Sequence, residues 1–219
     1  QLINQMSPLV SYQFLTQNLH ITSLSEEDSY NVGGVAIGGL TNGISVREMT
    51  GAYQIFGNGG KYTTPHCYTT VEDSSGEIIL EKKVNSVQAI SSQTAYIMNR
   101  VMTQVLNSAD GRGTGQGLAT NRMESLGKTG TTSDDKDHWF MGLTPYYVTA
   151  SWLGYDDPAT LTVRHYATHP PTVAWRKVMN VSQRDLEYKS FDVPNGIVVR
   201  DFCVDTGMLA NDNCPTREK

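Results

Sequence analysis

Apolar residues spaced three and four apart predict helices at four places in the chain. The longest pattern follows Ser91 and Ser92 and predicts a helix with one face toward a core. A second helix opens at Ser45-Val46-Arg47-Glu48, which has the spacing of a capping box, and stops at Gly57-Asn58-Gly59-Gly60. Ser7-Pro8 and Pro170-Pro171 begin the other two. The apolar positions of the longest pattern are Ile97, Met98, Val101, Met102, Val105 and Leu106.

Runs of β-forming residues predict three consecutive strands, over 122–131, 138–143 and 147–155. The turns between them are short, with Thr144-Pro145 in one of them, so we expect antiparallel pairing. Most helices precede this sheet instead of alternating with its strands. The sequence therefore predicts an α+β fold, an antiparallel sheet flanked by helices.

Four other segments have weaker patterns. A hairpin is predicted over 66–73 and 77–83, and its polar faces indicate a solvent-facing flap. Gly196-Ile197-Val198-Val199 predicts an edge strand. The five glycines of the segment from Val32 to Gly43 indicate a loop or a close backbone crossing, and residues 108–120 indicate a glycine-rich link.

Composition places the chain among ordinary globular proteins. Of its 219 residues, 38% are hydrophobic and 18% charged, which excludes a disordered or fibrous class. The net charge is −5 and no long basic run is present, so we expect no nucleic-acid partner. No apolar run approaches the roughly 20 residues that span a bilayer.

The three cysteines, Cys67, Cys203 and Cys214, include no C-x-x-C pair, so we expect no zinc or other metal site. Cys203 and Cys214 flank a short loop that contains Gly207. A disulfide, which an oxidising compartment favours, and two separate thiols both remain open for this pair. Cys67 is expected to be a half-buried strand residue.

Two phosphate-loop interpretations fail on spacing. Gly127-Lys128-Thr129 resembles the end of a phosphate-binding loop, but the earlier glycine of that motif would fall at Arg122, and a strand follows instead of a helix. The glycines of 111–117 lack dinucleotide-binding spacing and do not follow a strand, so they indicate a flexible loop.

The segment Gly127 to Thr132 suits an anionic substrate if it lies on an exposed edge strand. Lys128 then shares a face with Gly130, and Thr129 shares the other with Thr131. A lysine attracts a carboxylate by about 4 kcal/mol at ~4 Å and an effective dielectric of about 20, before desolvation. Threonine hydroxyls add directional hydrogen bonds, Gly130 leaves room for substrate, and a free strand N–H can stabilise an oxyanion. The alternative is a solvated strand end.

The surrounding sequence resembles the transpeptidase domain of class A (bifunctional) penicillin-binding proteins, part of the serine β-lactamase and penicillin-binding fold. K-T-G is a motif of these enzymes. The resemblance covers nearly the whole chain, and its stretches, in order, are 43–60, Arg112-Gly113-Thr114-Gly115, 127–132, 137–145 and 152–158.

This resemblance implies a D,D-transpeptidase that uses a serine nucleophile and no cofactor. Its substrates would be peptidoglycan stem peptides ending in D-Ala-D-Ala, and β-lactams would acylate the same serine. Lys128 would aid proton transfer and hold the substrate carboxylate, which Thr129 and Thr131 also bind. The Thr131 N–H would supply part of the oxyanion hole, and Gly130 and Thr132 would complete the substrate-binding strand. The implied location is the extracytoplasmic face of the cytoplasmic membrane.

The family also needs S-x-x-K, which carries nucleophile and base, and S-x-N. Three stretches match the residue types of these motifs but not the structural setting that the motifs need. Ser125 precedes the motif lysine on an expected strand instead of a helix turn, Ser133-Asp134-Asp135-Lys136 lies in a polar turn, and Ser29-Tyr30-Asn31 falls where the family has a linker. We therefore expect no nucleophile in this chain.

The family order places both missing motifs before residue 1, on an upstream segment. We thus expect residues 1–181 to be the C-terminal portion of a transpeptidase domain and residues 182–219 to be a tail. A glycosyltransferase domain and a membrane anchor would precede them, so the membrane would be reached only through that anchor. A D,D-carboxypeptidase, a β-lactamase-type hydrolase and a catalytically silent peptide-binding module remain alternatives.

Overall fold

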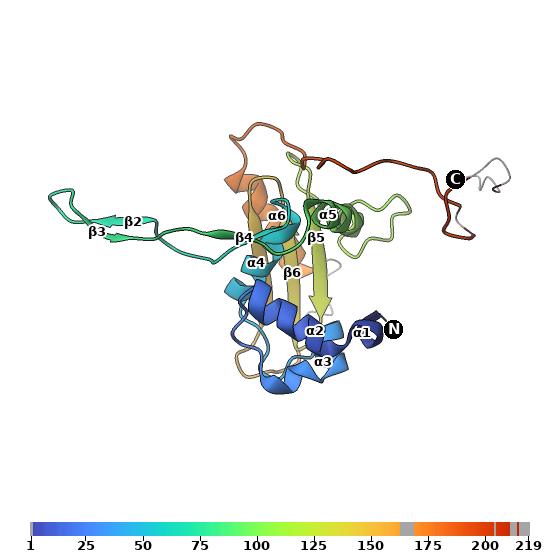
Figure 1. Ribbon diagram of the computed structural model, residues 1–219, viewed down its shortest axis with the longest axis horizontal. Helices are drawn as coiled ribbons and strands as arrows, with labels where there is room; N and C mark the ends of the chain where they lie inside the picture. Colours follow the sequence, from blue (N-terminus) through green and yellow to red (C-terminus); the bar gives the residue numbers. More distant parts are fainter. Residues whose placement is uncertain (1, 163–168, 204, 211–213, 215–219) are drawn as a thin grey trace.

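The computed structural model describes residues 2–162, 169–203, 205–210 and 214. At its centre is a three-stranded antiparallel sheet in the order β5-β6-β7 (Figure 1). The strands are β5 (Leu126–Thr131), β6 (Asp137–Leu143) and β7 (Val148–Gly154). Helices pack around the sheet, which confirms the predicted α+β fold and the antiparallel pairing. The first strand is shorter than predicted, because 122–125 lie outside it, and the third is shorter by one residue at each end.

The register of the sheet is continuous on both sides of β6. Leu126 lies opposite Leu143 at one end of the β5–β6 pair, and Thr131 lies opposite His138 at the other. The turn into β7 is closed by Thr144, whose N–H donates to the Tyr147 carbonyl at 2.9 Å. Its hydroxyl also accepts the Tyr147 N–H at 3.2 Å.

Buried side chains lie on both faces of this sheet. The cross-strand partners Leu126 and Leu143 pack with Met102 on one face. On the other, Phe140 packs edge-on against Trp175, with 5.0 Å between the ring centroids. Fully burying a side chain such as Phe140 contributes roughly 1.5–3 kcal/mol. Three helices pack on the sheet: α4 (Val46–Tyr53) on β7, α5 (Ser92–Leu106) on β5, and α6 (Pro170–Ser182) on β6 and β7.

A pair of glycines makes room for the two rings. Gly127 lies directly opposite Gly142 in the β5–β6 register. A Cβ atom on Gly142 would come within 2.2 Å of the Trp175 ring, and one on Gly127 within 2.3 Å of the Phe140 ring. Both positions therefore require glycine for packing, whatever their part in the motif.

The amino-terminal region contains several short elements that the sequence pattern did not indicate. As predicted, Ser7 caps a helix that starts at Pro8. The expectation of a loop from Val32 to Gly43 is wrong for residues 32–37, which form α3, whereas residues 38–43 lie outside any helix or strand. The Asn31 side chain accepts the Gly34 N–H at 2.9 Å and starts this helix, and Gly38, with φ 88°, ends it. The elements are α1 (Leu2–Met6), α2 (Pro8–Gln13), the π-helical η1 (Phe14–Asn18), the 3-10 helix η2 (Glu26–Ser29) and α3 (Val32–Ile37).

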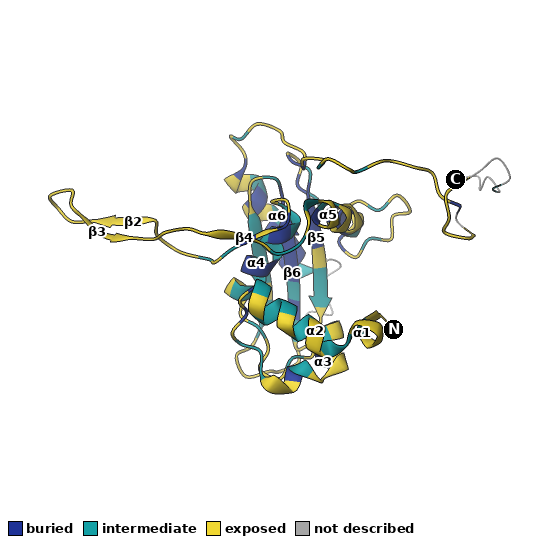
Figure 2. Ribbon diagram, in the orientation of Figure 1, coloured by how far each residue is buried: buried dark blue, intermediate teal, exposed yellow. Residues whose placement is uncertain are grey.

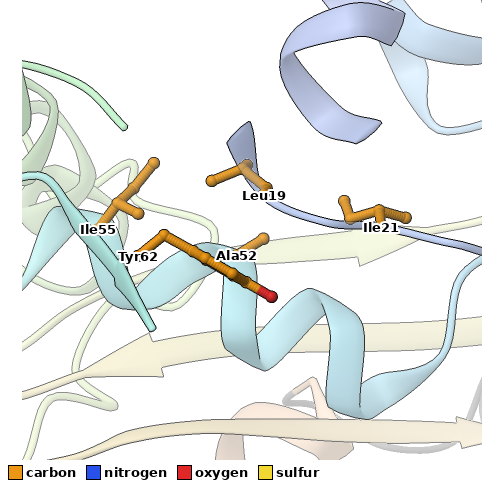
Figure 3. Packing of buried hydrophobic residues seen from close by; sticks show 5 residues of the cluster. All are labelled: Leu19, Ile21, Ala52, Ile55 and Tyr62. Atoms are coloured by element: carbon orange, nitrogen blue, oxygen red, sulfur yellow. The ribbon is translucent and has the colours of Figure 1, made fainter. Parts of the chain in front are cut away.

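A third buried cluster joins this region to α4 (Figure 3). The predicted capping box is present at the start of α4: the Ser45 hydroxyl accepts the Glu48 N–H at 3.2 Å, and the Glu48 carboxylate accepts the Ser45 N–H at 3.3 Å. A 3-10 turn, η3 (Gln54–Phe56), then leads into the glycines at 57–60. The cluster consists of Leu19, Ile21, Ala52, Ile55 and Tyr62.

Helix α5 forms where predicted but turns a different face to the core. Ile97 is 56% exposed and Val101 58% exposed, whereas Asn99 is buried and donates to the Phe56 carbonyl at 3.1 Å. The predicted core face is therefore wrong for these two residues and for Met98, and correct for Met102 and Leu106. Within the described part of the chain, no helix is both long and apolar enough to cross a membrane.

The predicted hairpin is present and extends away from the rest of the molecule (Figures 1 and 2). It consists of β2 (Thr70–Glu72) and β3 (Ile78–Glu81), which are shorter than predicted and exposed along their length. Its Asp73 carboxylate accepts the N–H groups of Ser75 at 2.8 Å and Glu77 at 2.9 Å, which closes the turn. At the base of this hairpin lies a second antiparallel pair of strands, which the sequence pattern did not indicate. It consists of β1 (Lys61–Thr63) and β4 (Ser86–Gln88).

The carboxy-terminal tail starts in the core but lacks the strand that the sequence predicts. Phe191 packs into the core beside Leu126, so the tail that follows residue 181 begins against the sheet. The expected strand at 196–199 does not form, and Val199 is 87% exposed. Cys203 and Cys214 are not joined in a disulfide, and Cys67 is exposed and lies outside a strand.

Candidate active site

Strand β5 has an open edge next to the K-T-G motif. Among the described residues it pairs with β6 alone. Just beyond its end, the Thr132 N–H donates to the Asp137 carbonyl on the β6 side at 3.2 Å. Backbone groups of successive strand residues point to opposite sides. The N–H and C=O of Thr131, and those of Thr129, therefore point to the open edge.

The side chains of the motif alternate between the two faces. Lys128 lies opposite Met141 and shares its face. Thr129 lies opposite Phe140 and Thr131 opposite His138, on the face that α6 covers. The open edge of β5 borders both faces, so a ligand along it would pass between the ammonium on one face and the hydroxyls on the other.

Lys128 is exposed, and its ammonium donates to the Thr129 carbonyl oxygen at 2.6 Å. That oxygen is one of the groups at the open edge, which agrees with the direction assigned to the Thr129 backbone. No ion pair of Lys128 is present in the described residues. Its charge is therefore available to an anion that lies along β5.

A glycine-rich loop brings a third hydroxyl to the strand. The Thr114 hydroxyl lies 2.8 Å from that of Thr129. The loop folds back onto the end of α5, because the Gly115 N–H donates to the Val105 carbonyl at 2.9 Å. A Cβ atom on Gly113 would come within 2.4 Å of the same carbonyl oxygen. The segment predicted as a flexible loop is thus held by hydrogen bonds, and its glycines let it approach the helix.

The structure also shows what the glycine of the motif accommodates. A Cβ atom on Gly130 would come within 3.2 Å of the Trp139 Cβ, tighter than an ordinary contact. Trp139 in turn pairs with Trp152 across β6 and β7, and both indoles donate to the Asp137 carboxylate, at 3.4 and 3.3 Å. Gly130 therefore keeps the strand close to this aromatic pair as well as leaving the edge open.

The hydroxyl of Thr132, which was expected to bind substrate, is used within the protein. It accepts the N–H groups of Lys136 at 3.0 Å and Asp137 at 2.9 Å and donates to the Asp137 carbonyl at 3.3 Å. These bonds close the β5–β6 turn and leave the hydroxyl no further proton to donate. Its contribution to the site is to fix the end of β5.

Two histidines that the sequence reasoning did not select lie next to Thr131. His138 is buried opposite it on β6 and is 3.2 Å from the Asp135 carboxylate. His169 stacks on His138 with 5.2 Å between ring centroids and 4° between the planes. Burial lowers the pKa of His169, the neighbouring His138 lowers it further, and the Gly130 backbone acts in the opposite direction. Alternation along β5 and β6 would have found His138, whereas nothing in the sequence marks His169.

In the structure, the three stretches that resemble the missing motifs have structural roles. Ser125 is buried, and its hydroxyl accepts the Thr120 N–H at 3.3 Å. Ser133 lies in the exposed turn after β5, where Lys136 pairs with Asp134 at 3.6 Å. In Ser29-Tyr30-Asn31 the asparagine caps α3. No group of three or more metal-binding side chains occurs within the described ranges.

Comparison with known proteins identifies the family. The penicillin binding protein transpeptidase domain family matches residues 18–165. Penicillin-binding protein 1A of Clostridium acetobutylicum is 34% identical over 175 residues, which is 80% of this chain and 21% of that protein. The chain thus spans about a fifth of this relative's length.

Solved structures share the fold. Penicillin-binding protein 1A from Haemophilus influenzae matches with a TM-score of 0.78 at 20% identity, covering 97% of this chain and 36% of that one. Penicillin-binding protein A from M. tuberculosis, solved as an imipenem acyl-enzyme complex, matches with a TM-score of 0.57 at 17% identity, covering 80% and 42%. The chain belongs to the penicillin-binding protein transpeptidase domain family.

Proposed function

We propose that this chain forms one wall of the active site of a peptidoglycan D,D-transpeptidase. The observation that carries the proposal is the open edge of β5, which presents backbone groups of Thr129 and Thr131 beside an exposed Lys128 that has no ion pair with any described residue. The acyl donor would be a stem peptide ending in D-Ala-D-Ala. Its terminal carboxylate would bind at Lys128, Thr129 and Thr131.

The backbone of Thr131 suits the charge that develops during acyl transfer. A serine hydroxyl attacks the penultimate D-Ala carbonyl, and the resulting oxyanion would accept the Thr131 N–H. The terminal D-Ala then leaves as the C–N bond breaks, and an amine of a neighbouring strand attacks the acyl-enzyme. A donor already fixed by the sheet needs no rearrangement at that moment, and one such donor contributes on the order of 10²–10³ in rate.

The serine and its base would come from an S-x-x-K segment elsewhere in the protein, since Ser125 and Ser133 have structural surroundings. Labelling the full-length protein with a fluorescent penicillin, followed by peptide mapping, tests this. We expect the adduct outside these 219 residues. An adduct on Ser29, Ser125 or Ser133 would contradict the proposal.

Substitution of Lys128 tests whether the K-T-G strand contributes to substrate binding. In the full-length protein, Lys128→Ala should slow penicillin acylation roughly 10- to 100-fold, the loss of a charge-assisted hydrogen bond. Lys136→Ala is the matched control, because Lys136 is also partly exposed but pairs with Asp134 in the adjacent turn. Equal effects of the two substitutions would contradict a role for Lys128 in binding.

The alternatives differ in their products. A transpeptidase yields cross-linked dimers when an acceptor amine is supplied, whereas a D,D-carboxypeptidase or β-lactamase-type hydrolase yields the free acid. A silent peptide-binding module forms neither product nor a penicillin adduct. β-Lactams and the cell envelope are the partner and location that the proposed activity implies, with attachment to the membrane through a segment outside this chain.

A further inference from the structure

A cavity of about 380 Å³ lies between the first two turns of α5, the turn that joins β6 to β7, and the tail that follows α6. Phe56, Pro145 and Phe191 supply apolar walls. Small-molecule pockets in proteins have volumes in this range and combine apolar walls with a few polar groups. Phe191 packs beside Leu126, so roughly 17 Å of strand separates the cavity from Thr131 at the other end of β5.

Two hydrogen bonds hold the tail against the rest of the fold and form the cavity in advance. The Phe191 N–H donates to the Glu124 carboxylate at 2.9 Å. Beyond the cavity, the Gln93 side chain at the start of α5 donates to the Asn195 carbonyl at 2.8 Å. Phe191 is itself buried. The tail wall is therefore fixed before any ligand arrives, which lowers the ordering cost of binding.

The cavity also contains a buried hydrogen-bond acceptor that has no partner. Asn99 lines it and is only 1% exposed. The Asn99 Nδ2 donates to the Phe56 carbonyl at 3.1 Å, and a carbonyl can only accept, so this bond fixes the orientation of the amide. The Oδ1 atom accepts no hydrogen bond from any described residue. Buried acceptors rarely lack a partner, so this oxygen calls for a donor on the occupant of the cavity.

Two side chains of opposite charge line the tail side of the same cavity. They are Lys189 and Asp192, and both are exposed. Neither forms an ion pair with a residue in the described ranges. The Lys189 ammonium lies 5.8 Å from the centre of the Tyr146 ring. The cavity thus offers a positive charge, a negative charge and an acceptor that needs an N–H.

We propose that this cavity binds a free amino acid with an apolar side chain. Its carboxylate would lie at Lys189, and its ammonium at Asp192 with one N–H donated to the Asn99 Oδ1 atom. Its side chain would pack on the apolar walls. A single small zwitterion thus satisfies all the polar groups named above. The proposal goes beyond the transpeptidase function and does not depend on it.

Isothermal titration calorimetry of the full-length protein tests the proposal. Racemic phenylalanine is the probe, so that either enantiomer can bind. We expect saturable binding with a dissociation constant of about 1 mM or tighter. Phenethylamine lacks the carboxylate and N-acetyl-phenylalanine lacks the ammonium, so each should bind roughly ten-fold more weakly. No saturable binding of phenylalanine, or equal binding of these two analogues, would overturn the proposal.

A third analogue tests the hydrogen bond to Asn99 without altering the protein. N,N,N-Trimethyl-phenylalanine keeps both charges but has no N–H to donate to the Oδ1 atom. It should therefore also bind roughly ten-fold more weakly than phenylalanine. If it binds as tightly as phenylalanine, the unpartnered oxygen is not part of the site and the proposed binding mode is wrong.

Variants locate the bound amino acid. Lys189→Met and Asp192→Asn should each weaken phenylalanine binding about five-fold, as expected for exposed charges. Lys177→Met and Asp157→Asn are the matched controls, because both residues are exposed and neither lines the cavity. Thermal unfolding checks that every variant folds. Unchanged binding in both cavity variants would place the ligand elsewhere and refute the proposal.

Lys128→Ala separates the cavity from the motif strand. Lys128 lies on β5 outside the cavity lining, so its removal should leave the dissociation constant of phenylalanine unchanged. A loss of binding in this variant would mean that the amino acid binds along the open edge of β5, and the assignment to the cavity would be wrong. Because this measurement needs no acylation, its outcome is independent of the proposed transpeptidase activity.

Discussion

The hydroxyl oxygens of Thr114 and Thr129 lie 2.8 Å apart, although 15 residues separate them in sequence. This contact joins the glycine-rich loop after α5 to the strand that carries the K-T-G motif. Because Thr129 is proposed to bind the substrate carboxylate, its partner holds the hydroxyl in position.

Thr114→Val should therefore lower the rate of penicillin acylation several-fold while leaving the unfolding temperature almost unchanged, since Thr114 is exposed. Stopped-flow acylation of the full-length protein measures this. Thr50→Val is the control, because the Thr50 hydroxyl donates to the Val46 carbonyl within α4, at 2.7 Å, and to no other described residue. If Thr114→Val leaves acylation unaffected, the contact has no positioning role.

Glu48 should make stability depend on acid pH. Burial by itself would raise the pKa of Glu48, but hydrogen bonds from Ser45 and Thr22 outweigh it and lower the pKa from 4.5 to about 2. A lowered carboxylate pKa means that the folded state binds fewer protons than the unfolded state. The stabilisation is complete above pH 4.5 and is lost as the pH falls toward 2.

Glu48→Gln should lower the free energy of unfolding at pH 7 by about 1–3 kcal/mol, because the Oε1 atom ties the Thr22 N–H at 2.8 Å to the start of α4. Urea unfolding between pH 2 and 7 measures both effects. Glu81→Gln on the exposed hairpin should retain the full acid dependence of the unmodified protein. An unchanged acid slope in Glu48→Gln would contradict this account.

His169 should contribute a second pH dependence near neutrality. Burial and His138 lower the pKa of His169 below its ordinary 6.5, so the unfolded chain binds more protons than the folded one just below that pH. Stability from this group is complete above pH 6.5 and decreases as the pH falls below it. His169→Gln should flatten that part of the curve, measured by thermal unfolding, whereas substitution of the exposed His66 should not.

Gly142→Ala tests the close packing of the Trp175 ring of α6 against the sheet at Gly142. The added methyl group would overlap the Trp175 ring, so we expect a loss of about 1–3 kcal/mol in the free energy of unfolding. Gly39→Ala is the matched control, since no atom lies within 4 Å of its added Cβ. Calorimetry should show a lower melting temperature for Gly142→Ala alone. Equal melting temperatures would mean that the sheet moves to admit the methyl group.

Local signals in the sequence predicted much of the fold. The Ser45–Glu48 capping box, the Asp73 turn and the proline start of α6 each depend on neighbours a few residues away, and all three form. The predictions are wrong where contacts between residues far apart in sequence determine the structure. Helix α5 turns Asn99 inward because Phe56, far away in sequence, offers its carbonyl, and this leaves Ile97 exposed.

In the candidate site, too, features set by local geometry could be predicted and features set by distant elements could not. The alternation of Lys128 and Thr129 on β5 follows from strand geometry and could be predicted. Thr114 and His169 reach the strand from other elements, so no spacing along the chain indicates their positions. The structural use of the Thr132 hydroxyl could not be predicted either, because it depends on the geometry of the turn to β6.

The open edge of β5 has a consequence for association between molecules. A row of unpaired N–H and C=O groups is a template on which the strand of another copy can add, the first step of edge-to-edge aggregation. Antiparallel pairing of two β5 edges around the motif would bring two Lys128 ammonium groups close together, and their repulsion disfavours it. The charge proposed to attract substrate thus also protects the strand that must stay unpaired to use it.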